Sequence, residues 1–172
     1  ATIEDSCATG DVVGDPNSSD VGGLVGANLA GDIVGCYATG AVGGGDGVGG
    51  LVADNRSGST ITNSYARGDV VGRSAVSGLV GGNSGSVSTC YATGKVTGDE
   101  YLGGLVGWDL AGEVNASFWD TETSGQADDG SGMGKTTAEV QTASTFLEAG
   151  WDFVDETANG TEDVWWIEEG KD

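Results

Sequence analysis

The sequence predicts an all-β fold: a parallel β-solenoid (β-helix) of four to five coils, with about 27 residues per coil, closed by a small C-terminal α+β cap. Two features of the 172-residue chain predict it. A short phrase recurs at intervals of 26 to 28 residues, and 34 glycines divide the chain into short segments rich in Val, Ile, Thr and Tyr. A fixed period of this size indicates one structural unit per repeat, each stacked on the last. We place the solenoid at residues 1–120 and a loop, a short helix and a Trp-rich capping segment at residues 121–172.

Each repeat carries one leucine in a Gly-Leu-Val unit. We expect these residues to form one aligned column in the core: Leu24, Leu51, Leu79 and Leu105. A second phrase follows each leucine, as in Cys90-Tyr-Ala-Thr-Gly-Lys-Val96. In a strand its Cys, Ala, Gly and Val share one face and its Tyr, Thr and Lys share the other. The small residues therefore point inward, and recurring glycines allow three short strands per coil joined by tight corners.

A third register holds an amide side chain. Its members are Asn28, Asn55, Asn83 and Asp109, each followed two or three residues later by glycine. Stacked Asn side chains can hydrogen-bond along a ladder, and Asn tolerates left-handed backbone angles. We expect this register to form a corner of the solenoid.

Three cysteines occur in the second phrase, at Cys7, Cys36 and Cys90. We interpret them as one inward column of small residues, with Ser64 and Ser117 as equivalents. A Cys7–Cys36 disulfide between adjacent coils stays open, whereas Cys90 lies two coils from Cys36, beyond bridging range. Thiolates on one column cannot converge on a tetrahedral zinc site.

These phrases resemble a known family. Gly-Gly-Leu-Val-Gly-x-Asn followed by Cys-Tyr-Ala-Thr-Gly-x-Val is similar to the GLUG repeat, found in large secreted or surface-attached proteins of bacteria and archaea. The resemblance covers about residues 1–120, and the segments after Phe118 resemble the tail that often closes such arrays. It implies an extracellular module of adhesive or structural type and carries no catalytic motif.

The tail predicts a different kind of structure. Thr136-Thr-Ala-Glu139 has the form of a capping box, which predicts a helix over about 137–149 that ends at Gly150. The chain's five tryptophans fall here and at the last coil: Trp108, Trp119, Trp151, Trp165 and Trp166. We expect these aromatic residues to cap the open C-terminal end of the solenoid. The alternative is a platform on which sugar rings stack.

Charge excludes several functions. Against 27 Asp and Glu stand six Lys and Arg, which gives a net charge of -21. The chain therefore lacks the basic patches that bind nucleic acid, and no apolar run is long enough to insert into a membrane. Histidine is absent, which removes the commonest general base, and we expect no enzymatic activity. Carboxylates at this density suit concentrated salt, so we expect a halophilic or marine source.

Acidic residues also raise the question of a metal. Asp120, Glu122, Asp128 and Asp129 offer oxygen ligands of the kind that Ca²⁺ takes, but their spacing matches no EF-hand loop. A solvated acidic loop is the simpler interpretation, so no cofactor is required. Asn-x-Ser/Thr sequons, which are candidate glycosylation sites in a secreted protein, occur at Asn17, Asn55, Asn115 and Asn159.

Together these features predict a non-enzymatic structural or adhesive repeat module of a larger cell-surface or secreted protein. Its partners at the N-terminal solenoid end would be neighbouring repeats or identical subunits, and cell-surface glycans are a further candidate. Two alternatives stay open: a subunit that assembles head to tail into an extracellular filament, and a carbohydrate-binding module that uses the aromatic tail.

Overall fold

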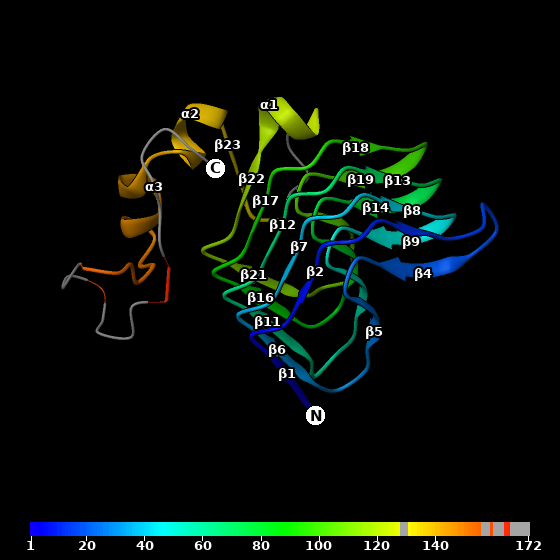
Figure 1. Ribbon diagram of the computed structural model, residues 1–172, viewed down its shortest axis with the longest axis horizontal. Coiled ribbons are helices and arrows are strands. Elements are labelled where there is room, and N and C mark those ends of the chain that lie inside the picture. The colour runs from blue at the N-terminus through cyan, green and yellow to red at the C-terminus, as the bar shows by residue number, and fades with distance from the viewer. Residues whose placement is uncertain (128–130, 156–158, 160–163, 166–172) are drawn as a thin grey trace.

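The computed structural model describes residues 1–127, 131–155, 159 and 164–165. Residues 2–120 wind into a solenoid whose strands pair in parallel with the strands of the coils on either side, which confirms the predicted fold class (Figure 1). Four coils are complete, at about residues 2–28, 32–55, 60–83 and 86–109, and a fifth begins at residue 113. One predicted repeat of about 27 residues thus corresponds to one coil of the solenoid.

Each complete coil contributes one strand to each of five sheets. Sheet A is formed by β1 (Thr2–Glu4), β6 (Asp32–Val34), β11 (Thr60–Thr62), β16 (Ser86–Ser88) and β21 (Glu113–Asn115). Sheet B is formed by β2 (Cys7–Ala8), β7 (Tyr37–Ala38), β12 (Tyr65–Ala66), β17 (Tyr91–Ala92), β22 (Phe118–Asp120) and β23 (Met133–Lys135). Sheet C is formed by β3 (Val12–Val13), β8 (Val42–Gly43), β13 (Val70–Val71) and β18 (Val96–Thr97).

Two further sheets complete the coil. Sheet D is formed by β4 (Ser19–Gly22), β9 (Asp46–Gly49), β14 (Ser74–Ser77) and β19 (Glu100–Gly103). Sheet E is formed by β5 (Val25–Asn28), β10 (Val52–Asn55), β15 (Val80–Asn83) and β20 (Val106–Asp109).

The coil has five strands where the sequence predicted three, because left-handed residues add bends that glycine spacing does not reveal. One such residue joins sheets A and B in every coil: Asp5, Gly35, Asn63, Thr89 and Ala116, with φ between 43° and 62°. A second lies within each sheet D strand: Asp20, Gly47, Ala75 and Tyr101, with φ between 53° and 63°. Of these nine residues, only Gly35, Gly47 and Asn63 are of the types that most readily adopt left-handed angles, so residue type alone does not predict the bends.

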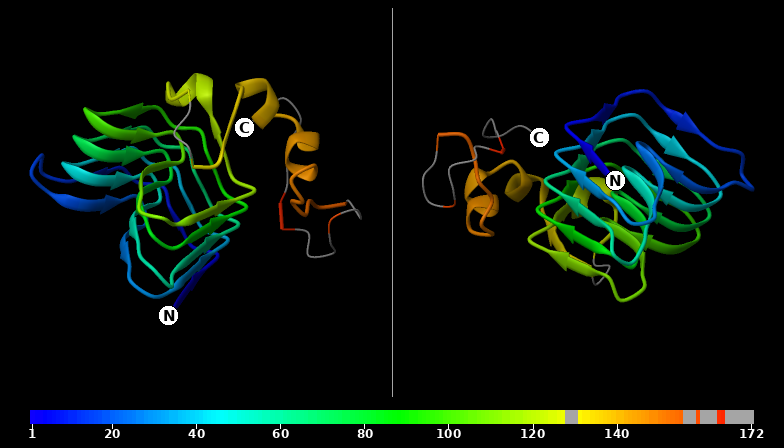
Figure 2. Two further views of the ribbon diagram at one scale, coloured as in Figure 1. Left: turned by 180° about the vertical axis from the view of Figure 1, so that it is seen from behind. Right: turned by 90° about the horizontal axis from the view of Figure 1, so that it is seen from below.

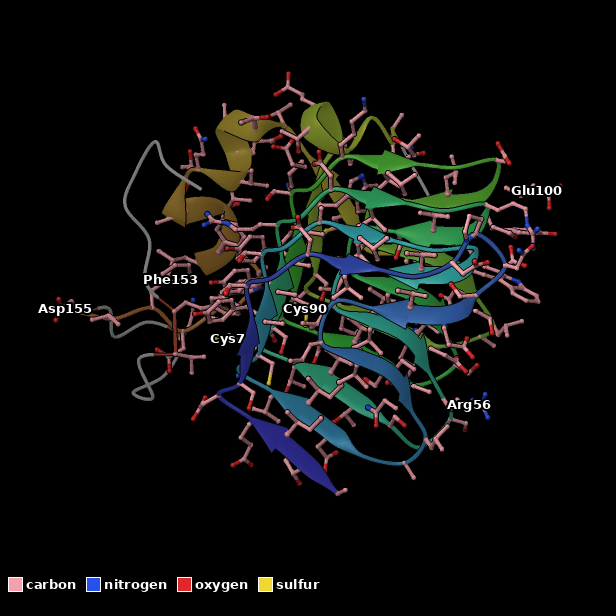
Figure 3. The ribbon with its side chains drawn as sticks, turned by 45° about the vertical axis from the view of Figure 1, so that its right-hand side comes forward. Cys7, Arg56, Cys90, Glu100, Phe153 and Asp155 are labelled. Carbon is pink, nitrogen blue, oxygen red and sulfur yellow. The ribbon has the colours of Figure 1, made fainter. Side chains whose placement is uncertain are left out.

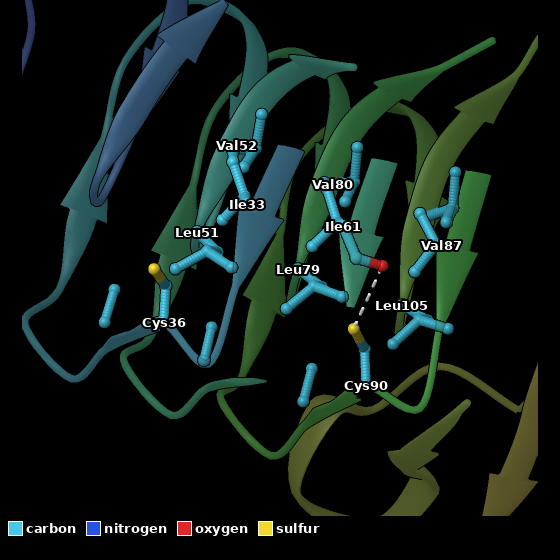
Figure 4. Packing of buried hydrophobic residues seen from close by; sticks show 14 of the residues in the cluster. Ile33, Cys36, Leu51, Val52, Ile61, Leu79, Val80, Val87, Cys90 and Leu105 are labelled. Atoms are coloured by element: carbon cyan, nitrogen blue, oxygen red, sulfur yellow. Dashed lines mark hydrogen bonds between the residues drawn. The ribbon is translucent and has the colours of Figure 1, made fainter. Parts of the chain in front are cut away.

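The predicted leucine column is confirmed. Leu51, Leu79 and Leu105 are fully buried, and the Leu51 N–H donates to Leu79 O at 3.0 Å, as the Leu79 N–H does to Leu105 O at 3.2 Å (Figure 4). Leu24, in the first coil, is partly buried against the same cluster. A second file of valines fills the space between sheets C and D: Val42, Val48, Val70, Val76 and Val96.

One tryptophan closes the C-terminal end of this core. Trp119 pairs in register with Ala92, so an indole lies above a column that elsewhere holds methyl groups. Its ring is 99% buried and rests on Gly104, where any side chain would overlap it. The Trp119 Nε1–H donates to Gln126 O at 2.9 Å in the segment that follows α1 (Thr121–Ser124). Residues 131–135 lie there too, because β23 pairs with β22 and the Ser131 hydroxyl donates to Asp109, so residues 119–127 and 131–135 together cover the end of the solenoid.

The rest of the tail lies on the flank of the solenoid, beside sheet B (Figures 1 and 2). Phe146 and Trp151 pack against Phe118, whose ring centroid is 5.4 Å from that of Phe146. This corrects the expectation for Trp151 and Trp165, which lie on the flank, whereas Trp119 does cap the end. The end needs only one large ring, whereas Tyr91 and Phe118 form an apolar strip along the side that the tail can bury.

The predicted helix at 137–149 is two helices, α2 (Thr137–Val140) and α3 (Ala143–Leu147). The capping box at Thr136 and Glu139 is present, and Gly150 ends α3 with a φ of 87°. Between the helices Thr142 is extended, and its hydroxyl donates to Ala138 O at 2.7 Å. Val140 and Phe146 are both buried against sheet B, yet six residues apart they would face different sides of one continuous helix. The break turns both inward.

Candidate functional site

Side chains of the outer faces are the candidates for function, because the interior is filled. On sheet B the outer face carries a ladder of tyrosines, Tyr37, Tyr65 and Tyr91, whose successive ring centroids are 5.0 Å apart and within 10° of parallel. Phe118 continues the ladder in register. The parity predicted for the second phrase is therefore correct, with tyrosine outside and alanine inside.

The tail aromatics cover the upper part of this ladder. The Trp165 ring lies 5.9 Å from Tyr91 and 4.5 Å from Trp151, and Trp151 is 99% buried. The Trp151 Nε1–H donates to Ala116 O at 2.8 Å. Trp151 is thus part of the core and presents no open face to a sugar, and Trp165 is partly buried against it. Trp166, the remaining aromatic of the predicted platform, lies outside the described residues.

A different aromatic pair is exposed. Tyr101 in β19 and Trp108 in β20 stack with ring centroids 5.6 Å apart and planes 21° from parallel, and they are 57% and 47% exposed. The sequence singled out Trp108 but missed Tyr101. The signal was available, since the positions equivalent to Tyr101 in the other coils are Asp20, Gly47 and Ala75.

The asparagine ladder is confirmed at the corner between sheets E and A. The Asn28 Nδ2 donates to Asn55 Oδ1 at 3.2 Å, and Asn55 Nδ2 donates to Asn83 Oδ1 at 3.0 Å. Asp109 is the last member and accepts from the Gly112 N–H and the Ser131 hydroxyl instead. Asn28 and Asn55 also donate to the backbone carbonyls of Gly31 and Ser86, whereas Asn83 Nδ2 is buried without a hydrogen-bond partner among the described residues. The hydrogen bonds of the register stabilise the corner.

The cysteine column is correct for two residues and wrong for the third. Cys36 and Cys90 are buried and inward, and each backbone N–H donates to the serine hydroxyl of the next coil at 3.1 Å, Ser64 and Ser117 respectively. Cys7 pairs in register with Tyr37, so it lies on the outer face and is exposed. A shift of one residue reverses the face of a strand, and the missing Tyr in the first phrase caused that shift.

This register also answers the disulfide question. All three cysteines are free, and Cys7 and Cys36 lie on opposite faces of sheet B. Burial raises the pKa of the Cys90 thiol to about 12, so this thiol is protonated at neutral pH. Its Sγ–H donates to Ser88 O at 3.1 Å, which is a structural contact.

Two of the four proposed calcium ligands serve as helix caps. Asp120 is buried and accepts from the Glu122 and Thr123 N–H groups through Oδ1 and from the Thr137 hydroxyl through Oδ2. Glu122 accepts from the Thr137 N–H at 2.9 Å. Asp128 and Asp129 lie outside the described residues, and within the described ones no group of three or more His, Cys, Asp or Glu could hold a metal ion.

The four sequons fall in different surroundings. Asn17 and Asn115 are exposed, and Asn17 lies in the loop between β3 and β4. Asn159 is exposed too, although its Nδ2 donates to Leu147 O and Trp151 O. Asn55 is fully buried in the ladder, so it cannot carry a glycan in the folded chain.

Acidic residues are separated along the stack. Asp32 pairs in register with Thr2 and Thr60, and Asp46 pairs with Ser19 and Ser74. Among the described strand pairs, no acidic residue lies directly opposite another. Carboxylates of one column are therefore about two strand spacings apart, roughly 10 Å rather than 5 Å. This placement lowers the repulsion that a net charge of -21 brings.

Basic residues are mostly paired. The Arg73 guanidinium binds both carboxylate oxygens of Asp46, and this hydrogen bonding lowers the pKa of Asp46. Arg56 Nε lies 2.6 Å from Asp54 Oδ2, and Lys135 Nζ lies 3.9 Å from Glu139 Oε1. Arg56 and Glu100 lie on the side of the molecule opposite Phe153 (Figure 3). No basic cluster that could hold a polyanion is formed by the described residues.

Comparison with known proteins identifies the repeat. A family model described as the GLUG motif matches residues 17–43, which run from the end of the first coil into the second. Residues 17–43 are a GLUG motif. The same Gly-Leu-Val and Tyr-Ala phrases recur in register in the following coils, so one GLUG-type unit corresponds to one coil of the solenoid. The predicted resemblance is confirmed.

A relative is known over most of the chain. It is named "Putative Gly-rich membrane protein" and comes from Evansella cellulosilytica, and it is 42% identical over 153 residues, or 89% of this chain. The chain spans 12% of that relative's length. No solved structure matches the chain. The described part of the chain has no helix of the length and apolarity that crossing a bilayer requires.

Proposed function

We propose that this chain is a non-enzymatic structural or adhesive module of a larger secreted or cell-surface protein. The observation that carries the proposal is the stack of GLUG-type coils, in which the strands of sheets B and E pair in register from one coil to the next. Each complete coil repeats the same two left-handed corners, so one coil can stack on another of its kind. This chain, which contains the GLUG motif, spans only 12% of the length of its relative. That small share supports a role as one module of a larger protein.

An experiment on intact cells tests the location. Antibodies raised against the folded chain should label unpermeabilised cells of the source organism, or detect the protein in the medium. A cytoplasmic protein serves as the permeability control. Labelling only after permeabilisation would contradict a surface role.

The absence of enzymatic activity is part of the proposal. Histidine is absent, and Arg56 and Arg73 are held in ion pairs with Asp54 and Asp46. The side chains of Asn28, Asn55 and Asn83 do not titrate, and burial raises the pKa of the Cys90 thiol to about 12. Hydrolysis of a panel of neutral and acidic polysaccharides by the purified chain would contradict it.

The filament is the second candidate, and the parallel, in-register pairing of successive coils is the observation in its favour, because coils that stack within one chain can also stack between chains. Head-to-tail assembly would also need the C-terminal end of the solenoid, where Trp119 and Gln126 cover the core. We therefore expect a monodisperse particle in light scattering and short rods in negative-stain electron microscopy. Long fibres from the wild-type chain would favour the filament instead.

A saline environment is the last part of the proposal. Interleaving keeps carboxylates about 10 Å apart, which is a Debye length at 0.1 M salt, and at 1 M the screening length falls to about 3 Å. The repulsion that remains between carboxylates should then be almost fully screened. We expect the melting temperature to rise steadily from 0.05 to 2 M NaCl, and a level or falling trend would contradict a halophilic source.

A further inference from the structure

The exposed pair of Tyr101 and Trp108 is not explained by the fold. The two rings stack on each other at 5.6 Å on the outer surface of sheets D and E, away from the buried clusters. Both belong to the fourth coil. Each is about half exposed, at 57% and 47%.

The other coils have no aromatic residue at the positions equivalent to Tyr101 and Trp108. In register with Trp108 are Gly82, Asp54 and Ala27. The left-handed position of Tyr101 is held by Ala75 in the third coil and by Gly47 in the second. Small residues therefore lie under the pair on the neighbouring coil, and they leave the surface beside the two rings open.

The pair is also costly. Tyr101 has a φ of 53°, a left-handed conformation that is unfavourable for a residue with a side chain. Two large aromatic rings exposed to water gain little from burial. Backbone strain combined with exposure, at positions where the fold accepts alanine or glycine, indicates selection for binding.

We propose that Tyr101 and Trp108 form a binding platform for a neutral saccharide. Flat aromatic faces suit the apolar face of a sugar ring. Asp99 and Glu100, exposed beside Tyr101, supply carboxylate oxygens that accept hydrogen bonds from sugar hydroxyls. A net charge of -21 repels acidic polysaccharides, so the ligand carries no negative charge.

A cationic peptide is the competing ligand, because acidic residues surround the rings. Its attraction is electrostatic and weakens as salt rises, whereas stacking of a neutral sugar does not depend on salt. At the high ionic strength that we propose for this chain, the platform therefore retains a neutral sugar and loses a cation.

The test titrates the full chain with neutral oligosaccharides, namely tetramers of β-linked glucose, of N-acetylglucosamine and of mannose, and with tetralysine. Binding is followed by calorimetry at 0.15 and 2 M NaCl. The variants are Trp108→Ala and Tyr101→Gly, which install residues that other coils carry at the same positions, so both should fold. Leu110→Ala is the control, because Leu110 is 51% exposed, lies two residues after Trp108 in the sequence, and is not aromatic.

At least one oligosaccharide should bind the wild type and the Leu110 variant at both salt concentrations, and Trp108→Ala and Tyr101→Gly should each weaken it at least tenfold. Tyr101→Gly should not lower the melting temperature, since it relieves a left-handed tyrosine. Binding of tetralysine alone, binding of no saccharide, or saccharide binding that survives both variants would each overturn the proposal. The platform requires only the folded coil, so its failure leaves the surface role untouched and the antibody experiment decides that role separately.

Discussion

The side-chain amide of Asn55 donates to Asn83 Oδ1 at 3.0 Å, although 28 residues of sequence separate them. Both residues are fully buried at the corner between sheets E and A. Asn55 also accepts from Asn28 on the coil below. One side chain thus links three successive coils.

Asn55→Ala should therefore lower the free energy of unfolding by about 2 to 3 kcal/mol, because it leaves buried partners in the ladder without hydrogen bonds. Urea denaturation followed by circular dichroism measures this. Asn17→Ala, in an exposed loop, is the control and should change stability by less than about 0.5 kcal/mol. Equal effects of the two variants would show that the ladder contributes nothing.

Gly104→Ala should destabilise the chain by about 1 to 3 kcal/mol, since the new methyl group overlaps the buried Trp119 ring. In a Trp119→Ala background the same change should cost almost nothing. A double-mutant cycle measured by urea denaturation gives the coupling free energy directly. Gly10→Ala is the control, because a methyl group there meets no atom within 4 Å. Additive effects of the Gly104 and Trp119 changes would disprove the end-capping role of Trp119.

Of the three thiols, Cys7 alone should react with a thiol reagent such as Ellman's reagent in the native chain at pH 8, because it lies on the outer face while Cys36 and Cys90 are buried. All three should react in denaturant. Cys7→Ser should abolish the native reaction. A second equivalent of fast reaction in that variant would place another cysteine at the surface.

The stability of the chain should decrease as pH rises above 9. Burial raises the pKa of Cys90 to about 12, so the unfolded chain releases this proton near pH 9 while the folded chain holds it. The contribution is complete below pH 9 and is lost at about 1.4 kcal/mol per pH unit between 9 and 12. Urea denaturation at pH 8, 9, 10 and 10.5 checks the slope. Cys90→Ser, which copies Ser64 and Ser117 of other coils, should reduce it, and an unchanged slope would exclude Cys90 as its source.

Ser74→Asp should destabilise the chain at low salt, because it places a carboxylate in register between Asp46 and Glu100. Melting temperatures at 0.05 and 2 M NaCl measure the effect, which should largely disappear at the higher concentration. Thr97→Asp adds the same charge next to Val71 and is the control. If both variants lose the same stability at low salt, interleaving of acidic residues has no energetic role.

Much of the fold and less of the candidate site could be predicted from the sequence. Leu51 and Leu79, or Asn55 and Asn83, occur at the same point of a repeating phrase, and a periodic chain that stacks must align them. Tyr101 was missed because what distinguishes it is a left-handed backbone and a contact with Trp108, and the repeat pattern predicts neither.

The sequence by itself determined the period, the inward and outward faces of the Tyr-Ala phrase from the second coil on, the GLUG-type unit and the acidic surface, because each depends on local alternation repeated from coil to coil. Tertiary structure alone decided the rest. Cys7 lies on the outer face because its register is set by pairing with Tyr37. The tail packs on the flank because Tyr91 and Phe118 form an apolar strip there. Trp119 lies at the end because its coil is the last one, and only the short strand β23 pairs beyond it. These outcomes depend on which surfaces remain free once the coils have stacked, and that is a property of the assembled solenoid.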